Sequence, residues 1–174
     1  MANDVSGGVF DPGMIGAVAR TGLPFVMMHM RGTPQTMERM KDYHAIVQQV
    51  TEGLRERSLA AGQGRIPRWL HVLDPGIGFA KTHEDSLLLL NELDKIKEGV
   101  GCPLLVGPSR KRFIGQILGE QRADQRDWGT AGACCASADR GASILRVHNV
   151  KGVAQALAVR DAIAMAAVNR EQER

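Results

Sequence analysis

The sequence predicts an α/β protein built on a parallel sheet, and three observations support that fold class. Short apolar runs of strand length alternate with longer segments in which apolar residues recur at helical spacing. Turns rich in glycine and proline separate the two kinds of segment. Polar side chains follow the apolar runs repeatedly. About five strand-helix units of this kind imply parallel strands covered by helices, in a single domain over residues 1–174.

The composition is that of an ordinary globular protein, and it argues against several functional classes. Of the 174 residues, 44% are hydrophobic and 24% are charged, with a net charge of +3. The basic residues are spread along the chain, so we expect no nucleic-acid partner. No apolar run reaches membrane-spanning length, so we expect no membrane partner. Cys102, Cys134 and Cys135 lack CxxC spacing, which argues against a disulfide framework and a zinc site.

The first half of the chain predicts two strands and two helices. The opening residues resemble the end of a strand, because polar residues and glycines follow almost no apolar lead-in. Asp11-Pro12 suits a helix N-cap followed by its first residue, and Gly22 suits its stop. An apolar run over 23–30 predicts the second strand. Apolar residues at helical spacing over 36–61 then predict one long helix.

The second half predicts three more strands, each followed by a helix. Residues 69–73 form an apolar run that delivers Asp74 to a glycine-rich turn. A capping box at Thr82 predicts a helix over 87–96. Asp127 suits the N-cap of a helix of small residues that ends near 138. The other predicted elements are strands over 102–107 and 143–149, a short helix after Lys111, a helix over 153–168 and a frayed tail over 169–174.

Side chains that can carry chemistry occur where the predicted strands end. In a parallel sheet or barrel the carboxyl ends of the strands meet on one face, so these side chains should converge there. The alternatives are a chance scatter of polar loop residues and, at Asp74-Pro75-Gly76, a simple turn. The residues concerned are Asn3, Asp4, His29, Arg31, Asp74, Ser109, Arg110, Lys111, Arg146 and His148. Three further histidines are interpreted as structural, namely His44, His71 and His83.

The converging side chains suit a flat polar ligand that carries an anionic group. A buried carboxylate at Asp74 can accept two parallel hydrogen bonds from an amide or amino edge, and Lys111 is its expected partner. Arg146 can stack on a ring or bind phosphate. Two residues apart in a strand, Arg146 and His148 point to the same side, which suits a polyanion. Ser109 can add an anion-binding donor, although the basic turn around it can also be merely solvated.

Five motifs occur along the chain, namely Asn3-Asp4-Val5-Ser6-Gly7-Gly8, Met28-His29-Met30-Arg31-Gly32-Thr33-Pro34, Leu73-Asp74-Pro75-Gly76-Ile77-Gly78-Phe79, Val106-Gly107-Pro108-Ser109-Arg110-Lys111 and Arg146-Val147-His148. Their order and spacing resemble those of dihydropteroate synthase, a sulfonamide target. The resemblance implies a TIM barrel that condenses 6-hydroxymethyl-7,8-dihydropterin diphosphate with 4-aminobenzoate, giving 7,8-dihydropteroate and diphosphate for folate synthesis. Arg112 stands where bacterial members often have serine, so the chain is more similar to plant or fungal members.

The resemblance also implies a role for each matching residue. Asn3, Asp74 and Lys111 would bind the pterin edge. Met28, Phe79 and Gly107 would line the pterin pocket. Arg146 would lie on the pterin ring, and His148 and Ser109 would bind the anionic group. The catalytic residues among these would be Lys111, Arg146 and His148. Positive groups would stabilise the charge of the departing diphosphate. Magnesium (Mg²⁺) would bind through the diphosphate, with no metal ligand from this chain.

The match to the family begins at its fourth strand. We therefore expect a partial TIM (β/α)8 barrel with about the last five βα units and without the N-terminal strands, cut from a larger enzyme. The resemblance implies a homodimer for the full-length parent, with fusion to a pterin pyrophosphokinase in plant or fungal forms. It implies a cytoplasmic location, or a mitochondrial one for a plant-type parent. Two alternatives are a pterin-binding methyltransferase and an inactive pterin-binding or assembly fragment.

Overall fold

Five short parallel strands form the centre of the protein, in a computed structural model that describes residues 1–172, with side chains through residue 166. The strands are β1 (Ala2–Asp4), β2 (Phe25–Met28), β3 (His71–Asp74), β4 (Leu105–Val106) and β5 (Ile144–Leu145). Strands β1, β2 and β3 form one sheet and β4 and β5 another, both parallel. A bridge between Leu73 and Leu104 joins the two sheets. The predicted α/β architecture with parallel strands is confirmed.

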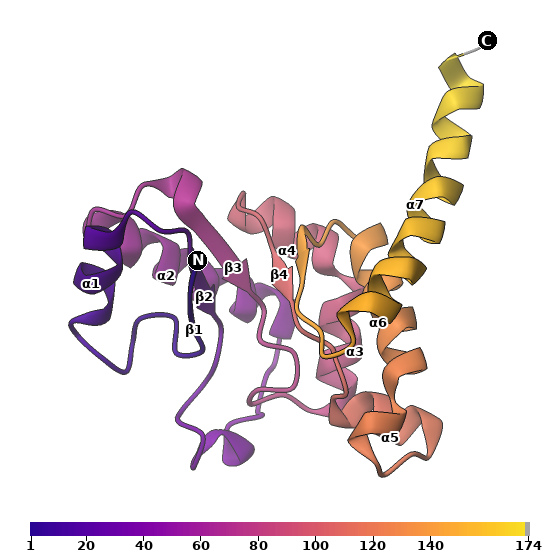
Figure 1. Ribbon diagram of the computed structural model, residues 1–174. Coiled ribbons are helices and arrows are strands. Elements are labelled where there is room, and N and C mark those ends of the chain that lie inside the picture. The colour runs from indigo at the N-terminus through magenta and orange to yellow at the C-terminus, as the bar shows by residue number, and fades with distance from the viewer. Residues whose placement is uncertain (173–174) are drawn as a thin grey trace.

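Helices connect the successive strands, as parallel pairing requires. They are α1 (Met14–Thr21), α2 (Ile46–Gln63), α3 (His83–Asn91), α4 (Leu93–Val100), α5 (Arg112–Leu118), α6 (Asp127–Asp139) and α7 (Val150–Gln172). Three single turns of 3₁₀ helix add to these, at Met37–Arg39, Arg68–Leu70 and Ala123–Gln125. Figure 1 shows α1 at one end of the strand array and α5, α6 and α7 at the other, where α7 projects beyond the body of the fold.

The central strands are buried on both faces, and successive residues divide between two apolar clusters. Phe25 and Met27 of β2 belong to the large cluster, which includes the apolar faces of α2, α3 and α4. Val26 belongs to a small cluster with Val72 and Leu105. Since side chains alternate along a strand, the small cluster lies on the side of the strands away from the helices. Burial on both faces explains why the strand sequence is a continuous apolar run.

The strand array curves, so that its first and last strands approach each other. Neighbouring strands lie about 4.8 Å apart, so β1 and β5 of a flat array would be separated by roughly 19 Å. Arg146, directly after β5, nevertheless donates a hydrogen bond to the Asn3 side chain in β1 at 2.8 Å. The carboxyl ends of the strands therefore surround one small space.

The long helix predicted over 36–61 is wrong in its first third. A 3₁₀ turn occupies Met37–Arg39, and α2 begins only at Ile46. The side chain of Gln49 accepts hydrogen bonds from the amides of residues 44 and 45, both at 3.2 Å, which closes the start of α2. Arg31 lies over the Tyr43 ring, 3.8 Å from its centroid, and this contact draws the intervening segment away from the helix axis.

Other predicted boundaries also shift. The capping box at Thr82 is confirmed with Asp85 as its reciprocal partner, but the helix predicted over 87–96 is two helices, α3 and α4. Asp127 is not an N-cap, because its carboxylate binds Arg110 instead. Helix α1 begins after Gly13 rather than at residues 11–12, and Gly22 ends it as predicted. The strands over 102–107 and 143–149 shrink to two residues each.

The end of the chain departs from its predicted form. Helix α7 begins at Val150 rather than at residue 153, and it continues through Gln172, past the predicted end at 168. Of the predicted frayed tail over 169–174, the first four residues therefore belong to α7, and residues 173–174 lie outside the described part of the chain.

Candidate functional site

Asp74, the last residue of β3, is the buried centre of the strand-end cluster. It is 1% exposed, because β2 and β4 flank β3 on both sides. The amide of Gly76 donates to one carboxylate oxygen at 2.7 Å, and Arg146 donates to the other at 3.1 Å. Burial raises the pKa of Asp74, while the Gly76 amide and the charges of Arg146, Lys111 and Lys81 oppose that rise.

Arg146 joins the first strand to the third across this space. One guanidinium nitrogen donates to Asn3 and another to Asp74, so the fork is shared between an amide and a carboxylate. Gly107, directly after β4, makes this placement possible. A Cβ atom at Gly107 would lie 2.9 Å from a guanidinium nitrogen of Arg146. The structure thus brings together Asn3, Asp74, Gly107 and Arg146, as the sequence predicted.

Lys111 does not pair directly with Asp74, which corrects the expected partner. Its ammonium group donates to the backbone carbonyl of Ile77 and lies 4.1 Å from the centroid of the Phe79 ring. Burial lowers the pKa of Lys111 to about 8, and the charge of Asp74 opposes that change. Lys111 therefore acts on Asp74 through its charge, while Arg146 supplies the direct contact.

The loop after β3 requires glycine at Gly76. This residue has a φ of 69°, and a Cβ atom there would lie 2.0 Å from the carbonyl oxygen of His29. The close approach places the loop against the end of β2, where Met28 is paired in register with Asp74. Met28 is fully buried, and Phe79 is half-buried on the same loop. Of the predicted pocket residues, Met28 thus lies beside Asp74, and Phe79 lies on the loop that follows Asp74.

Ser109 and His148 form a second pair at the strand ends. The Ser109 hydroxyl lies 2.8 Å from Nδ1 of His148, and the His148 amide donates to the same hydroxyl at 3.2 Å. Strand β5 ends at residue 145, so the strand alternation expected for Arg146 and His148 does not apply. Arg146 reaches β1 and β3, whereas His148 reaches the loop after β4.

Arg110 is structural, because it forms a two-pronged pair with Asp127. The two hydrogen bonds measure 2.8 and 3.1 Å, and Asn149 adds a third contact to the same carboxylate at 3.1 Å. Asp4 is also structural, since its carboxylate accepts from the amides of Ser6 and Gly8 in its own turn. These contacts remove two of the predicted strand-end residues from the set that faces a ligand.

Comparison with known proteins identifies the family. The model of the family described as pterin binding enzyme matches residues 1–148. This chain belongs to the pterin binding enzyme family. A buried carboxylate beside an amide and a guanidinium group, at the ends of parallel strands, agrees with that membership.

Relatives of this chain include dihydropteroate synthases. The dihydropteroate synthase of Synechocystis sp. is 43% identical over 94% of this chain and 56% of its own length. The mitochondrial folate synthesis bifunctional protein of Arabidopsis thaliana is 42% identical over 92% of this chain and 31% of its own length. The two identities are nearly equal, so overall identity favours neither the bacterial nor the plant type. The chain thus spans about half of the first relative and a third of the second.

Solved structures of the same family share the fold. Dihydropteroate synthase from Thermus thermophilus, in complex with 6HMPPP, superposes with a TM-score of 0.87 at 39% identity, covering 93% of this chain and 63% of that one. The same enzyme has been solved in complex with 4-aminobenzoate. The chain therefore has an α/β fold of the TIM-barrel type, with parallel strands.

The sequence patterns did not point to two cations near the strand ends, of which Lys81 is buried and Arg57 half-buried. Lys81 is 4% exposed and follows the loop that carries Phe79. Arg57 of α2 donates to the carbonyl oxygens of Met28 and Met30 at 3.0 and 3.1 Å, which fixes the end of β2. A lysine directly after a glycine-rich, otherwise apolar loop was the available signal for Lys81. No comparable signal marks Arg57, which sits among other charged residues of a helix.

The predicted structural role of His71 agrees with its contacts. Its ring is buried between the Ser58 hydroxyl at 2.9 Å and the Ile66 carbonyl oxygen at 3.0 Å.

Within residues 1–172, no helix has the length and hydropathy needed to cross a membrane. Nor do the described residues bring together three or more His, Cys, Asp or Glu side chains that could hold a metal ion.

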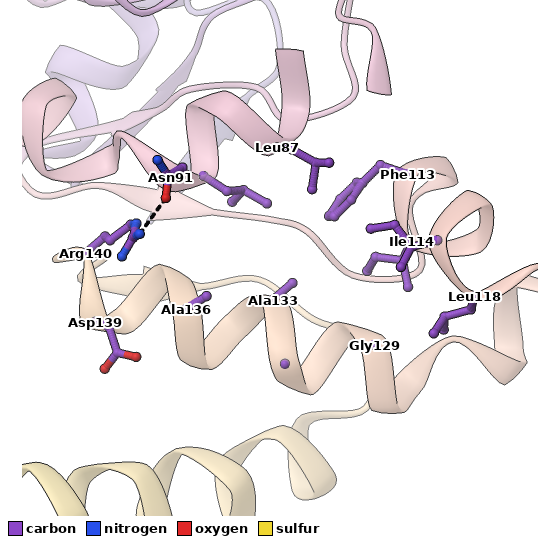
Figure 2. A pocket seen from close by; sticks show the side chains of 13 residues that line it. Leu87, Asn91, Phe113, Ile114, Leu118, Gly129, Ala133, Ala136, Asp139 and Arg140 are labelled. Carbon is purple, nitrogen blue, oxygen red and sulfur yellow. Dashed lines mark hydrogen bonds between the residues drawn. The ribbon is translucent and has the colours of Figure 1, made fainter. Parts of the chain in front are cut away.

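Two cavities of similar size differ in their relation to the strand ends. Figure 2 shows the first, of about 450 Å³, which lies between α3, α5 and α6 and is lined mainly by apolar side chains such as Leu87, Phe113 and Ile114. It contains none of the predicted site residues. The second, of about 430 Å³, adjoins Phe79 and Lys111. Its other cationic lining residues are Lys41, Lys81, Arg110 and Arg112.

Proposed function

We propose that this chain carries the pterin site of a dihydropteroate synthase, which condenses 6-hydroxymethyl-7,8-dihydropterin diphosphate with 4-aminobenzoate. The buried Asp74 carboxylate, held by Arg146 and the Gly76 amide, is the observation that carries the proposal. A carboxylate in this setting matches a ligand edge with two parallel N–H donors. The names of the relatives and solved structures support the same reaction.

The pterin edge would replace Arg146 at Asp74. Arg146 bonds one oxygen of Asp74, and its side chain is 41% exposed. Two N–H groups of the heterocycle would then bond the carboxylate, and the guanidinium plane would lie on the ring. Asn3 would hold a further polar atom of the edge, while Met28 and Phe79 would line the pocket. Gly107 leaves the space that Arg146 needs.

The group transfer requires stabilisation of the leaving diphosphate. The amino nitrogen of 4-aminobenzoate forms a bond to the pterin methylene carbon as the carbon–oxygen bond breaks, and diphosphate leaves with that electron pair. The nitrogen then loses a proton. Lys111, Ser109 and His148 would donate to the departing oxygens and hold their charge. Magnesium bound through the diphosphate is part of the proposal, without a ligand from this chain.

The cationic cavity beside Phe79 is the proposed place for the benzoate carboxylate. Lys41 and Arg112 line this cavity on the side away from Asp74, and neither has an acidic partner inside the cavity other than Glu38, which pairs with Lys41 at 2.6 Å. A carboxylate there would leave the amino group pointing toward the methylene carbon. Arg112 in particular can bind a carboxylate with two parallel hydrogen bonds.

The parent enzyme is proposed to contain more than this chain. We infer a partial barrel of about five βα units within one domain over 1–174, a homodimeric parent and, by analogy with the Arabidopsis relative, a fused pterin pyrophosphokinase. A cytoplasmic or mitochondrial location belongs to the same proposal. Sequencing the transcript upstream of Met1 tests the partial barrel. An in-frame stop directly before Met1 would contradict it.

The variant Asp74→Asn tests the proposed pterin site. Calorimetry with the pterin diphosphate should show at least a hundredfold loss of affinity, because Asn has an NH₂ donor in place of one carboxylate oxygen and cannot accept two parallel hydrogen bonds from the pterin edge. Asp161→Asn, on the exposed face of α7, is the matched control and should bind like the unaltered chain. Unchanged affinity in Asp74→Asn would refute the site.

An activity assay on the same samples separates the alternatives. Release of diphosphate on addition of 4-aminobenzoate supports the synthase, whereas methyl transfer would support a pterin-binding methyltransferase. Pterin binding without diphosphate release would identify an inactive binding fragment.

A further inference from the structure

Lys81 is a buried cation that lies at the junction of two strand-end loops. Its ammonium group donates to the Phe79 carbonyl oxygen at 2.9 Å and to Nδ1 of His29 at 3.2 Å, with a longer contact of 3.5 Å to the His29 carbonyl oxygen. Phe79 belongs to the loop after β3, and His29 directly follows β2. A single side chain, 4% exposed, therefore ties the two loops together.

The loop that Lys81 holds is conformationally strained. Gly76, Gly78 and Ala80 all have positive φ, and Ala80, at 49°, is a residue type that rarely adopts this region. Ala80 is also 1% exposed, so the loop cannot relax toward solvent. Such a conformation persists only where surrounding contacts fix it. Two backbone carbonyl oxygens of the loop make these contacts. The Ile77 oxygen accepts a hydrogen bond from Lys111, and the Phe79 oxygen accepts one from Lys81.

We propose that Lys81 is a positioning residue, which holds Phe79 against Lys111 and the Gly76 amide against Asp74 in the geometry that a pterin ring requires. This inference rests on the proposed pterin site. Within the described residues, the hydrogen bonds of the Lys81 ammonium group go to His29 and Phe79 rather than to Asp74. Lys81 acts through the loop over residues 75–81, whose Phe79 ring and Gly76 amide are the parts that face the ligand.

Several charged groups face Lys81, and they determine how it titrates. Burial lowers the pKa of Lys81 to about 7, with the charges of Lys111 and Arg31 adding to that change and those of Asp74 and Asp85 opposing it. The Tyr43 ring lies 6.0 Å from the ammonium nitrogen. Burial and the neighbouring cations lower the pKa of His29 to about 2, so its ring stays neutral and Nδ1 can accept from Lys81.

Deprotonation of Lys81 should loosen the loop and stabilise the fold as a whole. A neutral amine forms weaker hydrogen bonds than an ammonium group, so the tie to Phe79 weakens above pH 7. The ordinary pKa of a lysine, 10.5, applies to the unfolded chain. Between pH 7 and 10.5 the unfolded chain thus binds the extra proton, and the free energy of unfolding rises with pH.

The test compares Lys81→Met, Lys81→Arg and the control Lys95→Met, which removes an exposed lysine of α4 that pairs only with Glu92. Amide hydrogen exchange of residues 76–80 is measured in each unliganded 174-residue chain. Rates are divided by the intrinsic rate at each pH. We expect at least tenfold faster exchange in Lys81→Met at pH 6, no change in Lys95→Met, and protection restored in part in Lys81→Arg.

Calorimetry with the pterin diphosphate at pH 6 and pH 8.5 supplies the second readout. At pH 6 the unaltered chain should bind the pterin diphosphate about tenfold more tightly than Lys81→Met, and at pH 8.5 the two affinities should be nearly equal. The affinities of Lys81→Arg and Lys81→Met should not converge in this way. Unchanged exchange of residues 76–80 in Lys81→Met, or an affinity ratio that is constant with pH, would overturn the proposal. If the unaltered chain binds no pterin, the proposed function fails, and the exchange result alone decides the role of Lys81.

Discussion

The cationic cavity beside the strand-end site and the apolar cavity between α3, α5 and α6 have similar volumes of about 430 and 450 Å³, yet the side chains in the two regions differ in chemistry. The cavity in Figure 2 is lined by leucine, isoleucine and small residues, and its polar contact is a bond from Arg140 to Asn91 at the margin. The strand-end site gathers a buried carboxylate and several cations from different loops. The two regions are therefore not distinguished by cavity volume. They are distinguished by whether the ends of several strands converge there.

Gly76→Ala should lower the free energy of unfolding the most, and the substitution lies in the strand-end region. The added Cβ atom would lie 2.0 Å from a backbone oxygen, and the residue keeps a φ of 69°. We expect a loss of about 3 kcal/mol or more in the free energy of unfolding, measured by urea denaturation. Gly22→Ala is the matched control, with a φ of 65° and no heavy atom within 4 Å of the added Cβ. It should cost about 1 kcal/mol, and equal losses in both would contradict the steric argument.

Arg146→Met and Arg140→Met compare the two regions directly. Arg146→Met leaves Asp74 without its ion-pair partner and should destabilise the fold by about 2 kcal/mol at pH 7, an effect moderated by the 41% exposure of Arg146. Arg140 bonds a neutral amide at the edge of the cavity, so its loss should change stability by about 0.5 kcal/mol or less. Urea denaturation measures both. A larger effect at Arg140 would reverse the comparison.

Gly132→Ala should have the smallest effect and the opposite sign. Gly132 lies inside α6 on the wall of the apolar cavity, and nothing stands within 4 Å of an added Cβ. Alanine should raise the free energy of unfolding by roughly 0.5–1 kcal/mol without changing pterin affinity. Gly129→Ala, one turn earlier, should instead destabilise, because its Cβ would lie 2.5 Å from Ile114. A fall in pterin affinity in Gly132→Ala would show that the two regions are coupled.

Much of the fold follows from local patterns in the sequence. Apolar runs between glycine and proline predicted four of the five described strands, while β1 was expected only as the end of a strand, and the Thr82 capping box and the stop at Gly22 were correct. The errors lie where a tertiary contact competes with a local preference. Asp127 is a good N-cap residue, but Arg110 takes its carboxylate. Residues 36–45 have helical periodicity, but the contact between Arg31 and Tyr43 holds them in another path.

The residues of the candidate site were predictable, whereas their pairing was not. Strand ends in a parallel sheet converge by topology, so Asn3, Asp74 and Arg146 could be grouped before any coordinates were known. Lys111 was the expected partner of Asp74 because opposite charges in neighbouring loops attract. The distance between them depends on side-chain length and on the Gly76–Phe79 loop, which offers Lys111 the Ile77 carbonyl instead.

By itself, the sequence determined the alternation of strands and helices, the residues at the strand ends and the need for glycine near Asp74, because these depend on local periodicity and backbone conformation. Only the tertiary structure decided that Arg146 bonds Asp74, that Gly107 makes room for it and that Lys81 is buried beside His29. Such contacts join residues up to 143 positions apart. Their geometry is set by the curvature of the strand array, which no short stretch of sequence encodes.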